Sequence, residues 1–181
     1  AGDAAVARTR AWADWVAAAP LCPWAKNSVA KPEAVSYVAT TAATRDAFFA
    51  AVEAAARELA KTTADASAAI AFVVAPAFLA DDFPAFSEAV EDLEDEYLPE
   101  AGAWADDVQV AGFHPGWTFA GLPPDAPVHF EKRAPHPTVS VVLVRGFAGA
   151  DSARVADDNE RVLERLGTSE LRRVFEGFDH G

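Results

Sequence analysis

The chain has 181 residues, 51% of them hydrophobic, which is enough apolar surface for one domain with a sizeable core. Its net charge of −13 is unevenly placed, because residues 81–107 hold eleven acidic residues and no Lys, Arg or His. That acidic segment repels phosphate and no basic stripe compensates for it, so nucleic acid is excluded as a partner. The longest apolar run, residues 66–80, is too short for a transmembrane segment, so we expect a soluble protein.

The first half of the chain alternates predicted helices and strands. An Ala-rich segment predicts a helix over residues 3–18. Weak alternation predicts a short strand at residues 35–38, and apolar residues at spacings of three and four predict a helix over residues 41–61. The continuous apolar run at residues 69–75 favours a central strand that is buried on both faces.

Residues 82–99 predict an acidic amphipathic helix. Asp81 or Asp82 can cap it, and Pro84 is tolerated in its first turn. The carboxylates fall on the outward faces of this helix, without the spacing and central glycine of an EF-hand calcium loop. We therefore expect a solvated face, or a docking surface for a basic protein partner. Exposed aromatic side chains are the other candidate docking surface.

The second half predicts two more strands and a helical end. Residues 108–111 and 138–145 have the β-branched character of strands, and residues 128–131 are expected to be short and extended. Residues 150–181 predict a C-terminal helical extension of a single domain, 1–181. The expected fold class is α/β (or α+β), with a single layer of about four strands and helices packed on it.

The N-terminus favours a processed protein. Methionine is absent from the chain, including position 1, which is Ala1. We therefore expect that a leading targeting segment was removed and that the protein resides in an organelle, with a plastid favoured by the composition rich in Ala, Arg and Pro. The cytoplasm is the alternative location.

The stretch Gly112–Gly121 concentrates unusual residue types directly after a predicted strand. It holds His114, Trp117 and Phe119 between glycines, and Pro115 restricts the backbone of His114 before it. A histidine held rigidly at the end of a strand is typical of a functional site, because sites are commonly built on loops at strand ends.

Two further rigid loops carry reactive side chains, Cys22 beside a proline and Arg133 to His136 between prolines. If the loops converge, His114 beside Cys22 would form an ion-pair nucleophile, and Arg133 would bind a carboxylate or phosphate. Alternatively Cys22, His114 and His136 would form a three-ligand metal site. The structural interpretation is that Cys22 is a buried apolar residue, the histidine caps a turn and the arginine pairs with a carboxylate.

These loops resemble the domain of unknown function 1415 family over roughly residues 12–146. The resemblance rests on Trp15 with Leu21-Cys22-Pro23-Trp24-Ala25, on Phe113-His114-Pro115-Gly116-Trp117-Thr118-Phe119-Ala120-Gly121, and on Arg133-Ala134-Pro135-His136-Pro137-Thr138. It implies Cys22, His114 and Arg133 as site positions and assigns no reaction. The chain departs from the family pattern around the third loop, where asparagines, a serine and a histidine are replaced.

Two functions from different classes follow. In the first, the chain holds a small anionic ligand in a pocket at Cys22, His114 and Arg133, with Trp117, Phe119 and His136 as ligand-binding residues. Neither a reaction nor a cofactor follows from these residues, and no metal is expected. In the second, the chain is a non-catalytic accessory or structural subunit of a larger organellar complex, such as a photosynthetic one.

Overall fold

The computed structural model describes residues 2–22, 25–62, 65–147 and 151–179. Pro23 and Trp24 of the first loop, Ala1, and the beginning and end of the segment 150–181 lie outside the described residues. No helix within the described ranges is both long enough and apolar enough to cross a membrane.

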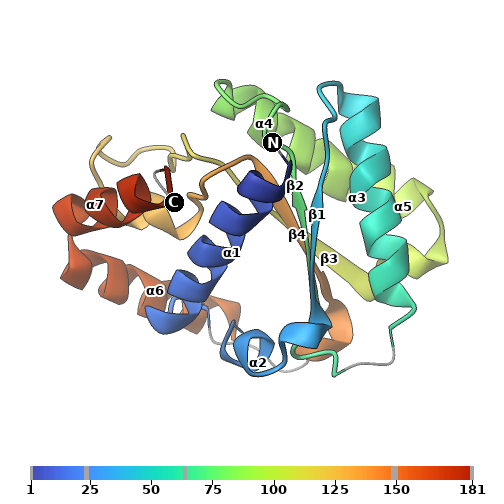
Figure 1. Ribbon diagram of the computed structural model, residues 1–181, viewed down its shortest axis with the longest axis horizontal. Coiled ribbons are helices and arrows are strands. Elements are labelled where there is room, and N and C mark those ends of the chain that lie inside the picture. The colour runs from blue at the N-terminus through green and yellow to red at the C-terminus, as the bar shows by residue number, and fades with distance from the viewer. Residues whose placement is uncertain (1, 23–24, 63–64, 148–150, 180–181) are drawn as a thin grey trace.

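A single four-stranded mixed sheet forms the centre of the molecule and confirms the α/β fold class (Figure 1). Its strands lie in the order β1-β2-β4-β3; β1 is parallel to β2, and β4 is antiparallel to both of its neighbours. The strands are β1 (Val35–Ala39), β2 (Ile70–Val74), β3 (Val108–Phe113) and β4 (Thr138–Leu143). The carboxyl ends of β1, β2 and β3 therefore meet the amino end of β4 at one edge of the sheet.

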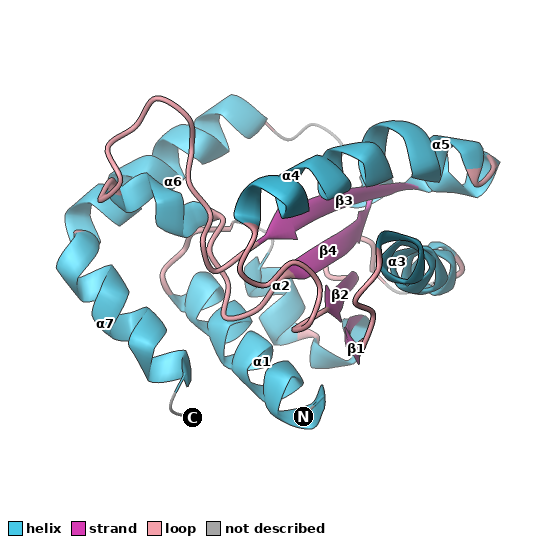
Figure 2. Cartoon of the chain, turned by 90° about the horizontal axis from the view of Figure 1, so that it is seen from above, coloured by secondary structure: helices cyan, strands magenta, loops and turns pink. Residues whose placement is uncertain are grey.

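Helices cover both faces of this sheet, as the view from above shows (Figure 2). One face carries α3 (Arg45–Ala60), α4 (Phe83–Asp92) and α5 (Leu98–Glu100). The opposite face carries α1 (Gly2–Ala18), α2 (Ala25–Ala30), α6 (Ser152–Leu166) and α7 (Thr168–Asp179).

The main core lies on the face under α3 and α4. Because successive strand side chains point to opposite faces, alternate residues of β2 and β4 enter this core. They include Val73, Val139 and Val141, all fully buried, and they pack with Phe48 of α3 and Phe86 of α4. The other side chains of the same strands point toward α1 and α6, where the packing is less complete.

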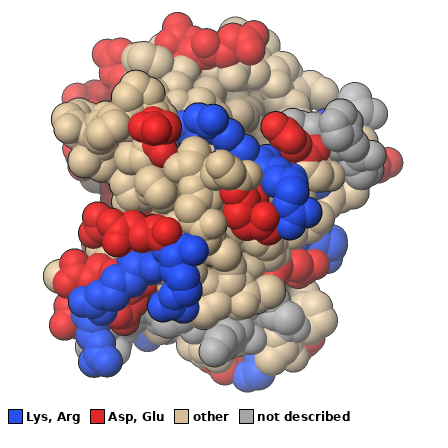
Figure 3. Space-filling view, turned by 90° about the vertical axis from the view of Figure 1, so that its left-hand side faces the viewer, with Lys and Arg blue, Asp and Glu red and all other residues tan. Residues whose placement is uncertain are grey.

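The α1 face has its own, smaller apolar clusters. Leu21 packs with Phe130, Leu163 and Leu171, and this contact attaches α6 and α7 to the rest of the chain. The outward side of α6 and α7 bears Arg and acidic groups side by side (Figure 3). Its ion pairs, such as Arg173 with Glu170, are mostly exposed and contribute little to stability.

Two local predictions differ from the structure. Residues 128–131 are not extended, because Pro127 begins a 3-10 helix, Pro127–Glu131; a proline has the φ that the first helical position needs. The acidic helix predicted at 82–99 is not uniform, since a π-helical turn, Leu93–Tyr97, separates α4 from α5. Asp82 caps α4, accepting a hydrogen bond from the Ala85 amide at 3.1 Å.

Candidate functional site

His114 lies at the carboxyl end of β3 and is fully buried. Its Nδ1 accepts a hydrogen bond from the Gly116 amide at 3.0 Å, so Nε2 carries the proton and donates to the Leu79 carbonyl at 3.0 Å. The rings of Phe83 and Phe86 pack against it. Burial lowers the pKa of His114, while the Leu79 carbonyl and nearby acidic groups oppose that shift. In this geometry the imidazole is neutral and joins two loops.

His129, which was not a candidate from the sequence, makes the same pattern of contacts. Its Nδ1 accepts a hydrogen bond from the Phe119 amide at 3.1 Å, and its Nε2 lies 2.8 Å from the Pro123 carbonyl. Phe119 also stacks on the His129 ring. His129 therefore holds the loop that runs from Phe119 through Pro123, and the Phe119 ring contributes to this contact.

Arg133, Trp117 and His136 lie on the adjoining loops. Arg133 Nε donates to the Trp117 carbonyl at 3.1 Å, and its guanidinium lies 4.5 Å from the centre of the Phe130 ring. Burial, together with the positive charge of Arg172, lowers the pKa of Arg133. The His136 carbonyl accepts a hydrogen bond from the Thr138 hydroxyl at 2.9 Å. Arg133 is linked to the loop of His114 through Trp117.

A large cavity lies on the face of the sheet that carries α1 and α6, between these helices and the strands. Its volume is about 800 Å³, within the range of small-molecule sites. Cys22 lines this cavity, whereas His114 and Arg133 are not among the described residues that do. The structure thus gives Cys22 a different environment from the other two candidates, and the common site proposed from the sequence has no shared cavity within the described ranges.

A row of aromatic rings forms one side of the cavity. Tyr37 stacks on Phe72, Phe72 meets Trp12 edge to face, and Trp12 meets Phe113, with centroid distances of 5.1, 6.0 and 5.0 Å. All four side chains line the cavity. Because they come from α1, β1, β2 and β3, only the folded sheet assembles this row.

A cation lies at each end of the aromatic row. The Arg10 guanidinium is 4.4 Å from the Tyr37 ring centre, and Lys132 Nζ is 5.0 Å from the Phe113 ring centre and 5.6 Å from that of Trp117. Both cations line the cavity, and neither forms an ion pair or a side-chain hydrogen bond within the part of the chain that the structure describes. Arg10 is exposed at the mouth, and Lys132 is half-buried.

Polar groups complete the wall. Glu131 accepts a hydrogen bond from the Asn159 amide at 2.8 Å, and both residues line the cavity beside Lys132. Ser140 and Gln109 supply a hydroxyl and an amide from the sheet, and Asp14 adds a carboxylate on α1. A mainly apolar cavity with a few placed polar groups has the character of a ligand site.

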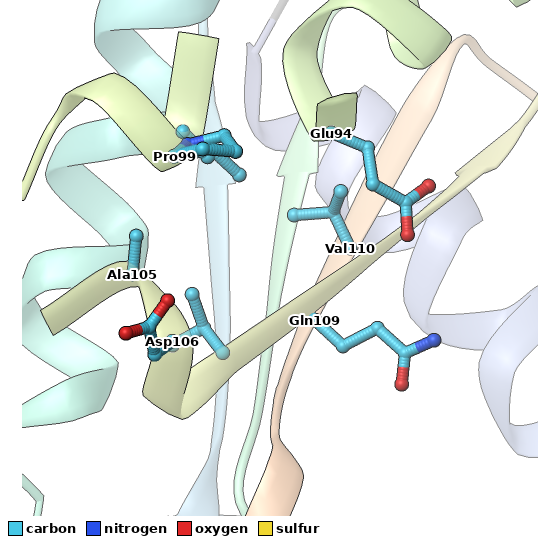
Figure 4. A pocket seen from close by; sticks show the side chains of 8 residues that line it. Glu94, Pro99, Ala105, Asp106, Gln109 and Val110 are labelled. Atoms are coloured by element: carbon cyan, nitrogen blue, oxygen red, sulfur yellow. The ribbon is translucent and has the colours of Figure 1, made fainter. Parts of the chain in front are cut away.

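A second hollow lies under the π-helical turn, on the other side of β3 (Figure 4). Its volume is about 90 Å³, which is too small for a ligand of several rings. Glu94 and Asp106 lie toward opposite sides of it, with Val110 between them and with Pro99 and Ala105 on the side of Asp106. Burial raises the pKa of Glu94.

The three-ligand metal alternative finds no support in the geometry. Among the described residues, no group of three or more His, Cys, Asp or Glu side chains could hold a metal ion. Cys22 and His114 lie in different environments, and both nitrogens of His114 already bond to the backbone.

Sequence reasoning missed Lys132, Arg10 and the aromatic row. Lys132 directly precedes Arg133 in a loop that was already of interest, so proximity to a candidate was the available signal. Arg10 and Trp12 lie on the Ala-rich helix, where their spacing indicated only an amphipathic element.

The comparisons with known proteins identify one family. Residues 4–173 match the family model described as "Protein of unknown function (DUF1415)". Neither the curated proteins nor the solved structures gave a significant match.

Proposed function

The chain belongs to the DUF1415 family, and we propose that it binds a small, flat, largely apolar anion in the cavity between α1 and the sheet. The observation that carries this proposal is the aromatic row with a cation at each end, Arg10 and Lys132, neither of which has an ion-pair partner among the described residues. Flat rings of a ligand would stack on the row, and its anionic group would meet one of the cations.

We infer a negative charge on the ligand from the burial of the Lys132 ammonium and from its lack of an acceptor among the described residues. An ammonium removed from water needs a compensating partner, because burial disfavours the charged form. Two aromatic rings supply part of that compensation through cation–π contacts, worth about 0.5–2 kcal/mol. The described residues provide no acceptor for Lys132 Nζ, so a ligand carboxylate or sulfonate would supply one.

We therefore place the anionic-ligand site expected from the sequence in the cavity between α1 and the sheet. Cys22 stays among its lining residues, while Lys132 and Arg10 take the anion-binding role that was predicted for Arg133. His114 has an indirect role outside the cavity. Its backbone amide donates to the Lys132 carbonyl at 3.0 Å and so holds the lysine backbone in place.

Calorimetry with two matched dyes tests this function. The probes are 8-anilinonaphthalene-1-sulfonate and N-phenyl-1-naphthylamine, which share their ring system and differ in the sulfonate. We expect saturable binding of one sulfonate dye per chain, about tenfold tighter than the neutral dye, a difference of about 1.4 kcal/mol. Lys132→Gln and Arg10→Gln should reduce that preference.

Two valine variants separate the cavity from the rest of the surface. Val142 lines the cavity, whereas Val38 on β1 is exposed to solvent and lies outside it. Val142→Trp should fill part of the cavity and abolish dye binding, while Val38→Trp should leave it unchanged. Equal binding by wild type and both variants would remove the proposal.

A second function rests on the acidic face of α4 and the π-helical turn. Glu88, Glu91 and Asp95 are exposed there, and this face is open to a basic protein partner. The aromatic side chains whose burial the structure describes are buried or half-buried, which favours the acidic face over exposed aromatics as the docking surface. Size-exclusion of native extract tests it: an accessory subunit elutes in a large complex that dissociates with salt, and elution only near 19 kDa argues against it.

A further inference from the structure

We propose that the side-chain amine of Lys132 forms an imine with an aldehyde or ketone group of a ligand in the cavity between α1 and the sheet. This inference rests on the proposed function, because the carbonyl compound must first enter that cavity. It adds a covalent step and a chemical class: a flat aldehyde or ketone that also carries an anionic group.

The position of Lys132 favours such a role. Lys132 lines the cavity, its Nζ lies 5.0 Å from the ring centre of Phe113 and 5.6 Å from that of Trp117, and among the described residues no carboxylate or carbonyl accepts a hydrogen bond from it. The lysine backbone is fixed on both sides, since its amide lies 3.3 Å from the His129 carbonyl and its own carbonyl accepts from His114. The amine therefore projects from a rigid loop, as a positioned nucleophile requires.

The protonation of Lys132 points the same way. Only the neutral amine attacks a carbonyl carbon, and an exposed lysine is almost entirely protonated near pH 7. Burial lowers the pKa of Lys132, and this effect outweighs the opposing influence of Glu131 and Glu94. The other three lysines of the chain include Lys31 and Lys61, which are ion-paired with Asp65 and Glu58.

The step is balanced without a further reactant. The lone pair of Nζ forms a bond to the carbonyl carbon, and the carbonyl oxygen takes up a proton to give a carbinolamine. The hydroxyl group then leaves as water with a proton from the nitrogen side, and a carbon–nitrogen double bond remains. Overall, one amine and one carbonyl give one imine and one water, with no change of oxidation state.

Arg10 determines how the ligand would be oriented. It lies at the far end of the aromatic row, beyond Tyr37 and Phe72, and no carboxylate of the described ranges forms an ion pair with it. A flat molecule with a carboxylate at one end and a carbonyl at the other would place its carboxylate at Arg10, its rings on the row and its carbonyl at Lys132.

Reductive trapping tests this inference with 6-formyl-2-naphthoic acid as the probe. The full chain is incubated with the probe and sodium cyanoborohydride, which reduces an imine to a stable secondary amine, and the modified peptides are located by mass spectrometry. We expect Lys132 to be modified at least tenfold faster than Lys31 or Lys61. The sulfonate dye, present in excess, should suppress modification of Lys132 alone.

Lys132→Arg is the control for the modified residue. Arginine is not a nucleophile toward the aldehyde, so the variant should lose the dye-sensitive adduct, while Lys31 and Lys61 should be modified at the wild-type rate. Dye binding by wild type without preferential trapping at Lys132 would overturn the imine and leave the binding function standing. Absence of both dye binding and trapping would overturn both.

Discussion

Replacing His114 with Phe is expected to destabilise the fold without changing its packing much. The new ring keeps most of the imidazole's volume between Phe83 and Phe86, but it cannot bond to Gly116 or Leu79. Two buried backbone groups then lose their partners, at about 1–3 kcal/mol each. We expect the free energy of unfolding to fall by about 2–4 kcal/mol, measured by urea denaturation followed by circular dichroism.

The pH dependence of this loss identifies the histidine as its cause. The pKa of His114 is lowered in the folded state, so the unfolded chain binds a proton more readily than the folded chain. The stability that the neutral imidazole supplies is therefore complete above its unfolded pKa of about 6.5 and is lost as pH falls toward the folded pKa. The slope is at most about 1.4 kcal/mol per pH unit.

The comparison of wild type with His114→Phe isolates this contribution from the other histidines. At pH 7.5 the difference in unfolding free energy should be largest, and it should shrink as the pH falls below about 6.5, because only the wild type loses stability through this residue. A difference that stays constant with pH, or one below about 0.5 kcal/mol at pH 7.5, would show that the two hydrogen bonds do not hold the loops as described.

Two further stability predictions concern the backbone. A Cβ added at Gly146 would clash with the Ala66 carbonyl oxygen, so Gly146→Ala should lower the unfolding free energy by about 1–3 kcal/mol. Gly177→Ala on α7 meets nothing within 4 Å and should raise it by about 0.5–1 kcal/mol. Urea denaturation of both variants measures the two changes, and equal changes in unfolding free energy would contradict the close approach of Gly146 to Ala66. Asp82→Ala removes the α4 cap to the Ala85 amide and should cost about 1 kcal/mol in the same assay, while Asp82→Ser, which can cap as well, should cost much less.

The elements of the fold could be predicted because each has a local signature. The apolar run around Val73 and the β-branched run around Val141 form neighbouring strands, and Gly167 ends α6 with a positive φ of 75°, which glycine adopts readily. Residues 127–131 could not be predicted in the same way, because the first turn of a 3-10 helix and a short strand differ little in a five-residue segment that contains one proline.

The sequence predicted the loops that carry the candidate residues, but not which of these residues lie together. The sequence picked out rigid loops correctly, because prolines and glycines restrict the backbone wherever they occur. It did not show that both nitrogens of His114 bond to carbonyl and amide groups of two loops, since Leu79 is 35 residues away in the chain. Hydrogen bonds of that kind depend on the packing of β2 against the strands beside it.

Residue type and short spacing were enough to predict the four strands, most of the helices, the three rigid loops and the family resemblance. The folded chain was needed to show that Cys22 shares a cavity with Lys132 rather than with His114, and that Trp12, Tyr37, Phe72 and Phe113 form one aromatic row. The physical reason is the mixed sheet: its order β1-β2-β4-β3 brings residues from distant segments to one face, and no local pattern encodes which of them meet.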